Sequence, residues 1–369
     1  MATKKTALVL GGGAPNLTLM SGALLALHEA GIQFEGIFMA GGGAVVGCVY
    51  LAPKALTPAQ ALEDTMNLGV SDAIYEMLPI NYKVFNKGGP SATAFRDYWK
   101  TLPEVQRAMN QYGMTDVEKL NSDWLLLNGA MICPTDVNFF SRGLCGHVPF
   151  IENLVDFEKL KTVIPDYTLT AYSIDDQDVE EFRKPFVGVH QFRASLSFPF
   201  IYPPYWIEGQ GHYYEGAAVE SLSLISVIQG WSHQIDQVIV FDVLTRDLIH
   251  RPRNLVDAYA QSIIVPLVAN AEKELAMFEY WIRTGVIVMP IPGLEYGLTP
   301  GLSDAVSKAG PDGETYDPPG LELFRIKFDI PESRRPYLLD WSRSNLESSF
   351  GLGYASGQRF LQEHPEVVL

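Results

Sequence analysis

The spacing of apolar residues along the 369-residue chain predicts alternating strands and helices. Short apolar or β-branched runs typical of buried strands cover 6–10, 34–38, 167–174, 237–244, 286–289 and 321–329. Helical spacing covers 17–30 and 255–284, and a further helix is expected to begin near Asn345. The first helix ends at Gly31, a residue type common just after a helix C-terminus. This alternation predicts an α/β fold whose mainly parallel central sheet is covered by helices on both faces.

Residues 70–165 depart from this alternation because they are rich in aromatic and methionine side chains. We expect a helical cap or insertion here, within a single domain that spans 1–369. One interpretation is a cap with its own small core. The other is a lid that lines an apolar pocket, since methionine and aromatic surfaces adapt to varied ligands. Residues 292–320 are rich in Gly and Pro, and we expect a loop.

A glycine-rich turn follows the first predicted strand. Gly11, Gly12 and Gly13 separate that strand from the first helix. Backbone N–H groups in such a loop, beside a helix N-terminus, can bind an anion or a developing oxyanion. The alternative is a tight turn without a ligand. Neither of the common phosphate-binding glycine motifs is present, so a nucleotide site is not predicted.

A second glycine-rich turn follows the second predicted strand. Residues 39–44 read Met-Ala-Gly-Gly-Gly-Ala, and a helix of small residues is expected to start at Gly43. In a strand–turn–helix nucleophile elbow, the sharp turn carries a serine flanked by glycines. Here Gly41 stands at the serine position, so the turn is predicted without its hydroxyl.

The two turns and a later motif resemble the patatin-like phospholipase family. That family has an oxyanion loop G-G-G-x-[RK]-G, an elbow G-x-S-x-G and a motif D-G-[GA] that supplies the Asp of a Ser–Asp dyad. Residues 8–16 (LVLGGGAPN) resemble the loop, 39–44 lie on the elbow, and 214–217 (YEGA) lie on the third motif. Segments 194–204 and 339–345 are also similar to the family. The resemblance implies a patatin-like three-layer fold and acyl-ester or phospholipid hydrolysis.

The chain departs from the family at the positions that carry catalysis. Gly41 replaces the nucleophile, Glu215 replaces the dyad Asp, Asn16 replaces the basic loop residue, and Met39 replaces the first elbow glycine. Together these changes indicate that the site no longer runs the acyl-enzyme mechanism. Glu215 is one methylene longer than Asp, so its carboxylate is expected to reach into the space left by the missing serine side chain. The alternative is that Glu215 is a tolerated relic of the motif.

Further groups are expected to bind the ligand beside Glu215. They are the backbone of Gly42, the glycines of the first turn and the amide of Asn16, which alternatively bonds local backbone at a helix start. Tyr213 shares a face with Glu215 if this segment is a strand, and it could assist as a hydrogen-bond donor. A simple packing role is the other interpretation. Ser21 is the nearest hydroxyl on the first helix, but no strong base accompanies it.

Composition limits the partners. The net charge of −16 argues against nucleic acid, because phosphate contacts need lysine and arginine. No run of 18 apolar residues is present, so no transmembrane segment is predicted. Three cysteines without C-x-x-C spacing indicate reduced thiols and a cytoplasmic protein. Seven scattered histidines show no paired-ligand spacing, so neither a metal nor a cofactor is predicted.

Three functions are therefore compatible with the sequence. The first is a cofactor-independent enzyme that acts on a lipid, acyl or other carbonyl-containing hydrophobic substrate, with Glu215 as acid or base and the glycine loop holding the carbonyl oxygen. A lyase, isomerase, hydratase or non-covalent hydrolysis would fit. The second is a non-catalytic protein that binds a lipid or acyl ligand. The third is a patatin-type hydrolase whose nucleophile is displaced or engineered out. We favour the first.

Overall fold

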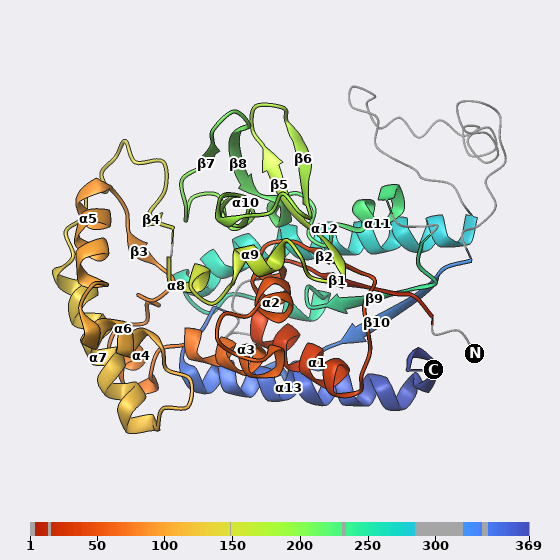
Figure 1. Ribbon diagram of the computed structural model, residues 1–369, viewed down its shortest axis with the longest axis horizontal. Coiled ribbons are helices and arrows are strands. Elements are labelled where there is room, and N and C mark those ends of the chain that lie inside the picture. Colours follow the sequence, from red (N-terminus) through yellow and green to blue (C-terminus); the bar gives the residue numbers. More distant parts are fainter. Residues whose placement is uncertain are drawn as a thin grey trace.

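The computed structural model describes residues 4–13, 16–147, 149–230, 234–284, 320–333 and 339–368. Its centre is an eight-stranded sheet with strand order β10-β9-β1-β2-β5-β8-β7, and β6 pairs with β5 (Figure 1). The strands are β1 (Thr6–Leu10), β2 (Gly36–Met39), β5 (Asp166–Ser173), β6 (Asp178–Arg183), β7 (Tyr205–Ile207), β8 (Gly211–Glu215), β9 (Gln237–Asp242) and β10 (Glu322–Lys327). The five strands from β10 to β5 run parallel to one another, whereas β6, β7 and β8 pair antiparallel.

Alternating side chains of the parallel strands enter two separate cores, one on each face of the sheet. In β1, Leu8 and Leu10 belong to one core and Ala7 and Val9 to the other. The first core packs under α1 (Leu17–Glu29), α2 (Gly42–Leu51), α3 (Pro58–Asp64), α10 (Val189–Ala194) and α13 (Arg343–Glu363). The second packs under α11 (Leu224–Gly230) and α12 (Leu255–Thr284). The result is a three-layer α/β architecture, in agreement with the predicted fold class.

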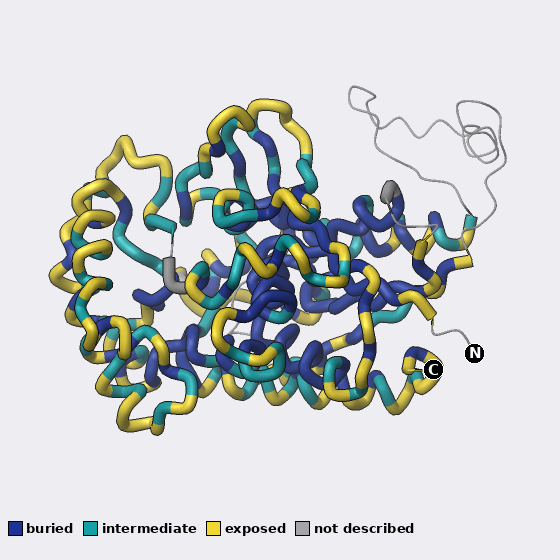
Figure 2. Tube along the Cα trace, in the orientation of Figure 1, coloured by how far each residue is buried: buried dark blue, intermediate teal, exposed yellow. Residues whose placement is uncertain are grey.

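A helical lobe lies to one side of the sheet (Figure 1). It consists of α4 (Asp72–Met77), α5 (Pro90–Trp99), α6 (Pro103–Met109) and α7 (Asp116–Ile132), with the two-stranded ribbon β3 (Asn86–Lys87) and β4 (Cys145–Gly146). Figure 2 shows far more exposed chain in this lobe than around the sheet. The segment then returns to the sheet through α8 (Pro149–Glu152) and α9 (Phe157–Leu160).

A buried ionic network joins the helical lobe to the C-terminal helix. The Asp123 carboxylate in α7 lies 2.7 Å from Lys83 Nζ and 3.4 Å from the guanidinium of Arg343, which begins α13. The side chains of Lys83 and Asp123 are almost fully buried. A buried carboxylate needs such cations and donors to offset its lost hydration, so this network fixes the lobe against the body of the protein.

The structure refines several of the predicted boundaries. Strand β2 occupies Gly36–Met39 instead of 34–38, and α13 begins at Arg343, two residues before Asn345. The expected strand 286–289 and nearly all of the loop 292–320 lie outside the described residues. Across the described ranges, no helix is both long and apolar enough to cross a membrane.

Candidate active site

The elbow predicted at 39–44 is a sharp turn between β2 and α2. Gly41 caps α2 with φ of 49° and ψ of −122°. Residues with a side chain rarely adopt this backbone conformation, which suits glycine. The helix that follows is fully apolar and buried through Val49, because it packs against the sheet. The turn is therefore built at the carboxyl end of a parallel strand, where ligand sites of open α/β sheets occur.

Glu215 occupies the space beside Gly41. A Cβ atom added to Gly41 would lie less than 3.0 Å from Glu215 Oε1 and 3.0 Å from the Cβ of Ala217. Glu215 ends strand β8, whose register places it opposite Ala171 of β5. A side chain at position 41 would therefore require the Glu215 carboxyl to shift. The structure thus brings together two of the positions at which the chain departs from the family pattern.

The Glu215 carboxyl is held in an apolar environment. The residue is 9% exposed, and burial raises the pKa of its carboxyl to about 8. No cation or hydrogen-bond donor among the described residues opposes this shift. Burial disfavours the ionised form, so at neutral pH the group is mainly a protonated acid. A carboxyl with a pKa near neutrality is suited to proton transfer.

The first glycine loop lies beside the same site, but not all of its backbone N–H groups are available to a ligand. The Gly12 N–H donates to the Ser221 carbonyl at 2.9 Å, and the Gly11 carbonyl accepts from Gly43 N–H at 3.0 Å. Added Cβ atoms at Gly11 and Gly12 would meet Leu222 Cδ2 at 2.7 Å and Ala217 Cβ at 2.6 Å. The expectation that all three amides serve a ligand is therefore wrong at Gly12. Close packing against 217–222 explains why glycines are needed here.

Two other predicted groups remain without a described partner. The Gly42 N–H opens α2, and within the described chain no acceptor is found for it. Asn16 is 8% exposed and precedes α1, but its side chain makes no cap hydrogen bond. The local role considered for Asn16, a bond to helix-start backbone, is thus not observed. Gly13 adopts φ of 120° next to Asn16, which places both at the entrance of α1.

Tyr213 is directed to other groups. It shares a face of β8 with Glu215, as the strand periodicity requires, and is 1% exposed. Its hydroxyl donates to Glu180 Oε2 at 2.5 Å, and its ring packs against Phe182. The hydroxyl is therefore engaged by β6 and not by the Glu215 carboxyl. The accessory role considered for Tyr213 has no support in this arrangement, and the packing interpretation fits.

A serine–histidine pair that sequence reasoning missed lies close to Glu215. The Ser197 carbonyl accepts from Glu215 N–H at 3.1 Å, and Ser197 Oγ lies 3.1 Å from His147 Nε2. Burial, and then the charge of Arg193, lowers the pKa of His147 to about 4, so the imidazole is neutral. Ser197 is fully buried, and its single proton has a closer acceptor in the Arg193 carbonyl at 2.8 Å. The pair is better described as packing beneath Glu215 than as an activated nucleophile.

Neither Gly41 nor Glu215 lines either of two well-formed cavities among the described residues. One, of about 440 Å³, lies inside the helical lobe, with walls from α5, α6 and α7. The other, of about 370 Å³, is acidic and is lined by Tyr213, Glu180 and their neighbours on β5 and β6. The predicted pocket over the elbow is therefore not among these two cavities.

Comparison with known protein families identifies the family of this chain. The family model for patatin-like phospholipases matches residues 8–228, and the chain belongs to that family. VipD from Legionella pneumophila is similar over 98% of this chain and 67% of its own, with 13% identity and a TM-score of 0.37. Human GIVD cytosolic phospholipase A2 is similar over 99% of this chain and 60% of its own, with 11% identity and a TM-score of 0.45. No curated protein sequence matches the chain.

Proposed function

We propose that this patatin-family protein acts on a lipid or acyl substrate, or on another small hydrophobic substrate with a carbonyl group, without forming a serine acyl-enzyme. The observation that carries the proposal is the position of Glu215 beside Gly41, where an added Cβ would collide with its carboxyl. The group that the family uses as a nucleophile is replaced here by the backbone of a glycine and the carboxyl of an acid.

Glu215 supplies the proton chemistry in this proposal. With a pKa of about 8 the carboxyl is protonated at pH 7 and can donate to a carbonyl oxygen or a leaving oxygen. The Gly42 N–H is the backbone donor placed to hold an oxygen that gains charge, since it opens α2 and has no described acceptor. Asn16 adds a neutral amide at the neighbouring helix start. Proton transfer next to a carbonyl, elimination, hydration and direct water attack all fit this set.

A second candidate is a protein that binds a lipid or acyl ligand without turnover. The commitment of Gly12 N–H to the Ser221 carbonyl favours it, because the oxyanion loop then lacks one of its donors. A third candidate, hydrolysis through a displaced serine, finds little support. Ser21 Oγ is buried and bonds the Leu17 carbonyl of its own helix at 3.0 Å.

Four proteins test the proposal in an assay of short acyl esters: wild type, Glu215→Gln, Gly41→Ser, and Gly41→Ser combined with Glu215→Asp. Glu215→Gln keeps the volume but removes proton transfer, so turnover should fall about a hundredfold to ten-thousandfold. Gly41→Ser alone should give no efficient esterase, since Glu215 crowds the new hydroxyl. The double variant shortens the acid beside the new hydroxyl and should be the better esterase of the two serine variants.

Labelling with a fluorophosphonate separates the alternatives. The wild-type protein should not react, because Gly41 has no hydroxyl. Stoichiometric labelling at Ser197 or Ser21 would favour the third candidate, hydrolysis through a displaced serine. Full turnover by Glu215→Gln without labelling would remove Glu215 from the mechanism.

A further inference from the structure

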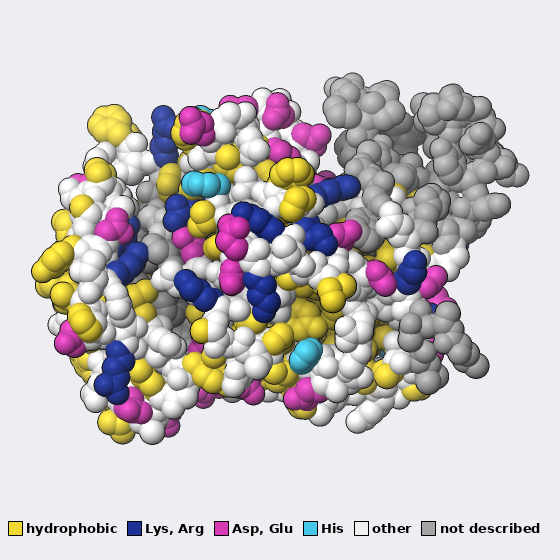
Figure 3. Space-filling model, in the orientation of Figure 1, with side chains coloured by type: hydrophobic (Ala, Val, Ile, Leu, Met, Phe, Trp, Pro, Cys, Tyr) yellow, Lys and Arg dark blue, Asp and Glu magenta, His cyan; other side chains and the backbone are white. Residues whose placement is uncertain are grey.

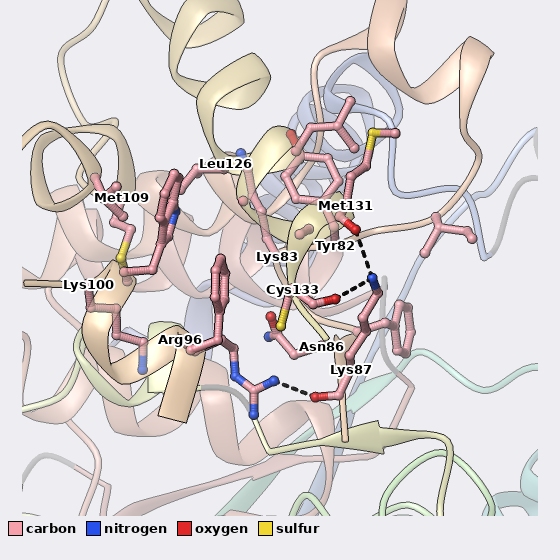
Figure 4. Close-up of a pocket in the computed structure, with 18 of the residues that line it drawn as sticks. Tyr82, Lys83, Asn86, Lys87, Arg96, Lys100, Met109, Leu126, Met131 and Cys133 are labelled. Carbon is pink, nitrogen blue, oxygen red and sulfur yellow. Dashed lines mark hydrogen bonds between the residues drawn. The ribbon is translucent and has the colours of Figure 1, made fainter. Parts of the chain in front are cut away.

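Two adjacent phenylalanines stand at the tip of a loop that projects from the helical lobe. Phe139 and Phe140 lie between α7 and β4, and they are 96% and 89% exposed. The loop projects at the upper left of Figure 1, and hydrophobic side chains cap the same projection in Figure 3. The lining of the lobe cavity in Figure 4 ends in sequence at Cys133, so neither ring belongs to that cavity. Contiguous exposed apolar side chains mark an interaction site more often than scattered ones do.

The exposure of the two rings is produced by an ordered turn. The Asn138 side-chain oxygen accepts from Phe140 N–H at 2.9 Å, and the Asn138 N–H donates to Ser141 Oγ at 2.9 Å. A backbone bond from Ser141 N–H to the Asn138 carbonyl at 3.0 Å closes the turn. The two rings contact edge to face, with centroids 5.7 Å apart. The turn therefore holds both rings outward, where the described chain leaves them almost uncovered.

The loop is joined to the segment that packs beneath Glu215. Leu144 N–H donates to the Phe200 carbonyl at 3.1 Å. Phe200 is itself 60% exposed and has φ of 73°, a conformation that is unusual for a bulky residue. Three residues earlier, the Ser197 carbonyl accepts from Glu215 N–H at 3.1 Å. The apolar loop therefore borders a segment that continues directly to the candidate site.

Both segments lack acidic residues, although the chain as a whole is strongly acidic. Aspartate and glutamate make up 43 of the 369 residues, yet neither 137–147 nor 194–207 contains one. Arg142 is the one lysine or arginine in either segment. Asp136, which precedes the loop, accepts from Ser91 N–H at 2.8 Å and is thereby held at the start of α5. Carboxylates are costly to dehydrate and are repelled by lipid phosphates, so their absence fits contact with a phospholipid surface.

A lipid surface fits this projecting tip better than a second protein does. Two phenylalanines bury about 300–500 Å², whereas a stable protein interface needs about 800 Å² on each partner. A fluid bilayer can close around a projecting side chain, because its molecules rearrange. The net charge of −16 opposes attraction to an anionic membrane. Binding must therefore come from apolar burial, which a zwitterionic surface permits.

We propose that the aromatic tip, Phe139 and Phe140, inserts into the surface of a zwitterionic phospholipid bilayer. Arg142 is exposed next to the tip, and a guanidinium there can pair with a lipid phosphate. The inference rests on the proposed function, because it gives a protein with a lipid or acyl substrate a means of staying at the surface in which such a substrate resides.

Flotation of the full chain with phosphatidylcholine vesicles in a density gradient tests the proposal. The wild-type protein should float with the vesicles, and raising the salt concentration should not release it, because salt screens charges and not apolar burial. Phe139→Ser combined with Phe140→Ser should weaken binding about a hundredfold or more, since burial of each ring is worth about tenfold or more. Adding phosphatidylserine to the vesicles should weaken binding at low salt, because the chain is acidic.

A second pair of exposed apolar side chains provides the matched control. Ile164 and Phe186 are 96% and 80% exposed. They flank the ion pair of Lys184 and Asp166, whose nitrogen and oxygen are 2.9 Å apart. They also lie at the start of β5, whereas Glu215 pairs near its end. Ile164→Ser combined with Phe186→Ser removes a similar amount of exposed apolar surface and should float like wild type.

Failure of this proposal is distinguishable from failure of the proposed function. Glu215→Gln should float like wild type, and the Phe139→Ser, Phe140→Ser double variant should retain the wild-type turnover of short soluble esters. No flotation of the wild-type protein, or equal flotation of wild type and this double variant, would overturn the proposal. A dimer in sedimentation equilibrium that the double variant loses, without flotation of the wild type, would assign the tip to a second copy of the chain instead.

Discussion

Replacing Gly41 by alanine should destabilise the protein for two separable reasons. First, the backbone there has φ of 49° and ψ of −122°, and a residue with a side chain held in such a region costs about 1–3 kcal/mol. Second, the new methyl group would overlap Glu215 Oε1 and press on Ala217 Cβ at 3.0 Å, an overpacking that costs about 1–3 kcal/mol. The total of about 2–6 kcal/mol is a large part of a usual stability of about 5–15 kcal/mol.

A double-mutant cycle separates the two terms. In a Glu215→Ala background the steric overlap with the carboxyl is gone, so the cost of Gly41→Ala should fall to the backbone strain of about 1–3 kcal/mol plus the remaining contact with Ala217 Cβ. Urea unfolding followed by circular dichroism gives the four free energies of unfolding. Gly351→Ala is the control, because an added Cβ there meets nothing within 4 Å in helix α13, and it should stabilise by about 0.5–1 kcal/mol. An equal cost of Gly41→Ala with and without the Glu215 side chain would show that the carboxyl does not crowd position 41.

Two further predictions concern buried charges. Because the Glu215 carboxyl has a pKa of about 8 in the folded protein against 4.5 for an ordinary carboxyl, the folded state binds more protons between these values. The free energy of unfolding should therefore fall by about 1.4 kcal/mol per unit as pH rises from 4.5 to 8, and Glu215→Gln should lose this component. Glu274 titrates in the same window, so the difference between the two proteins is the readout, and identical slopes would contradict the assignment. Asp123→Ala leaves Lys83 and Arg343 as buried cations without their carboxylate, so it should cost about 3–5 kcal/mol in urea unfolding. A cost below about 1 kcal/mol would show that the network does not fix the helical lobe.

The parallel core was predictable because its strands are short apolar runs separated by helical patterns. β6 reads Asp-Val-Glu-Glu-Phe-Arg, and its three acidic residues concealed a strand at the solvent-exposed part of the sheet. β7 has only three residues, too short for a period to show. Antiparallel additions of this kind depend on pairing partners more than on local pattern.

The site was predictable only where the type of a residue by itself determines its backbone conformation or its reach. The glycines of 39–44 indicated a turn, and the extra methylene of Glu215 suggested its reach. The bond from Gly12 N–H to the Ser221 carbonyl joins residues 209 positions apart, so the sequence near either residue does not predict it. The engagement of Tyr213 by Glu180 depends likewise on the neighbouring strand. The cavity in the helical lobe arises from the packing of three helices, although the richness of 70–165 in aromatic and methionine residues was its trace in the sequence.

We propose that an uncharged Glu215 carboxyl stands where the family has its nucleophile. The most direct test is carbon-13 NMR of protein labelled at the glutamate side-chain carboxyl carbon, compared with the same spectra of Glu215→Gln to identify the resonance. We expect a single Glu215 signal that titrates near pH 8, well above an ordinary carboxyl at 4.5. Titration near 4.5 would show a solvated, ionised carboxylate and would contradict both its burial beside Gly41 and its proposed role as an acid.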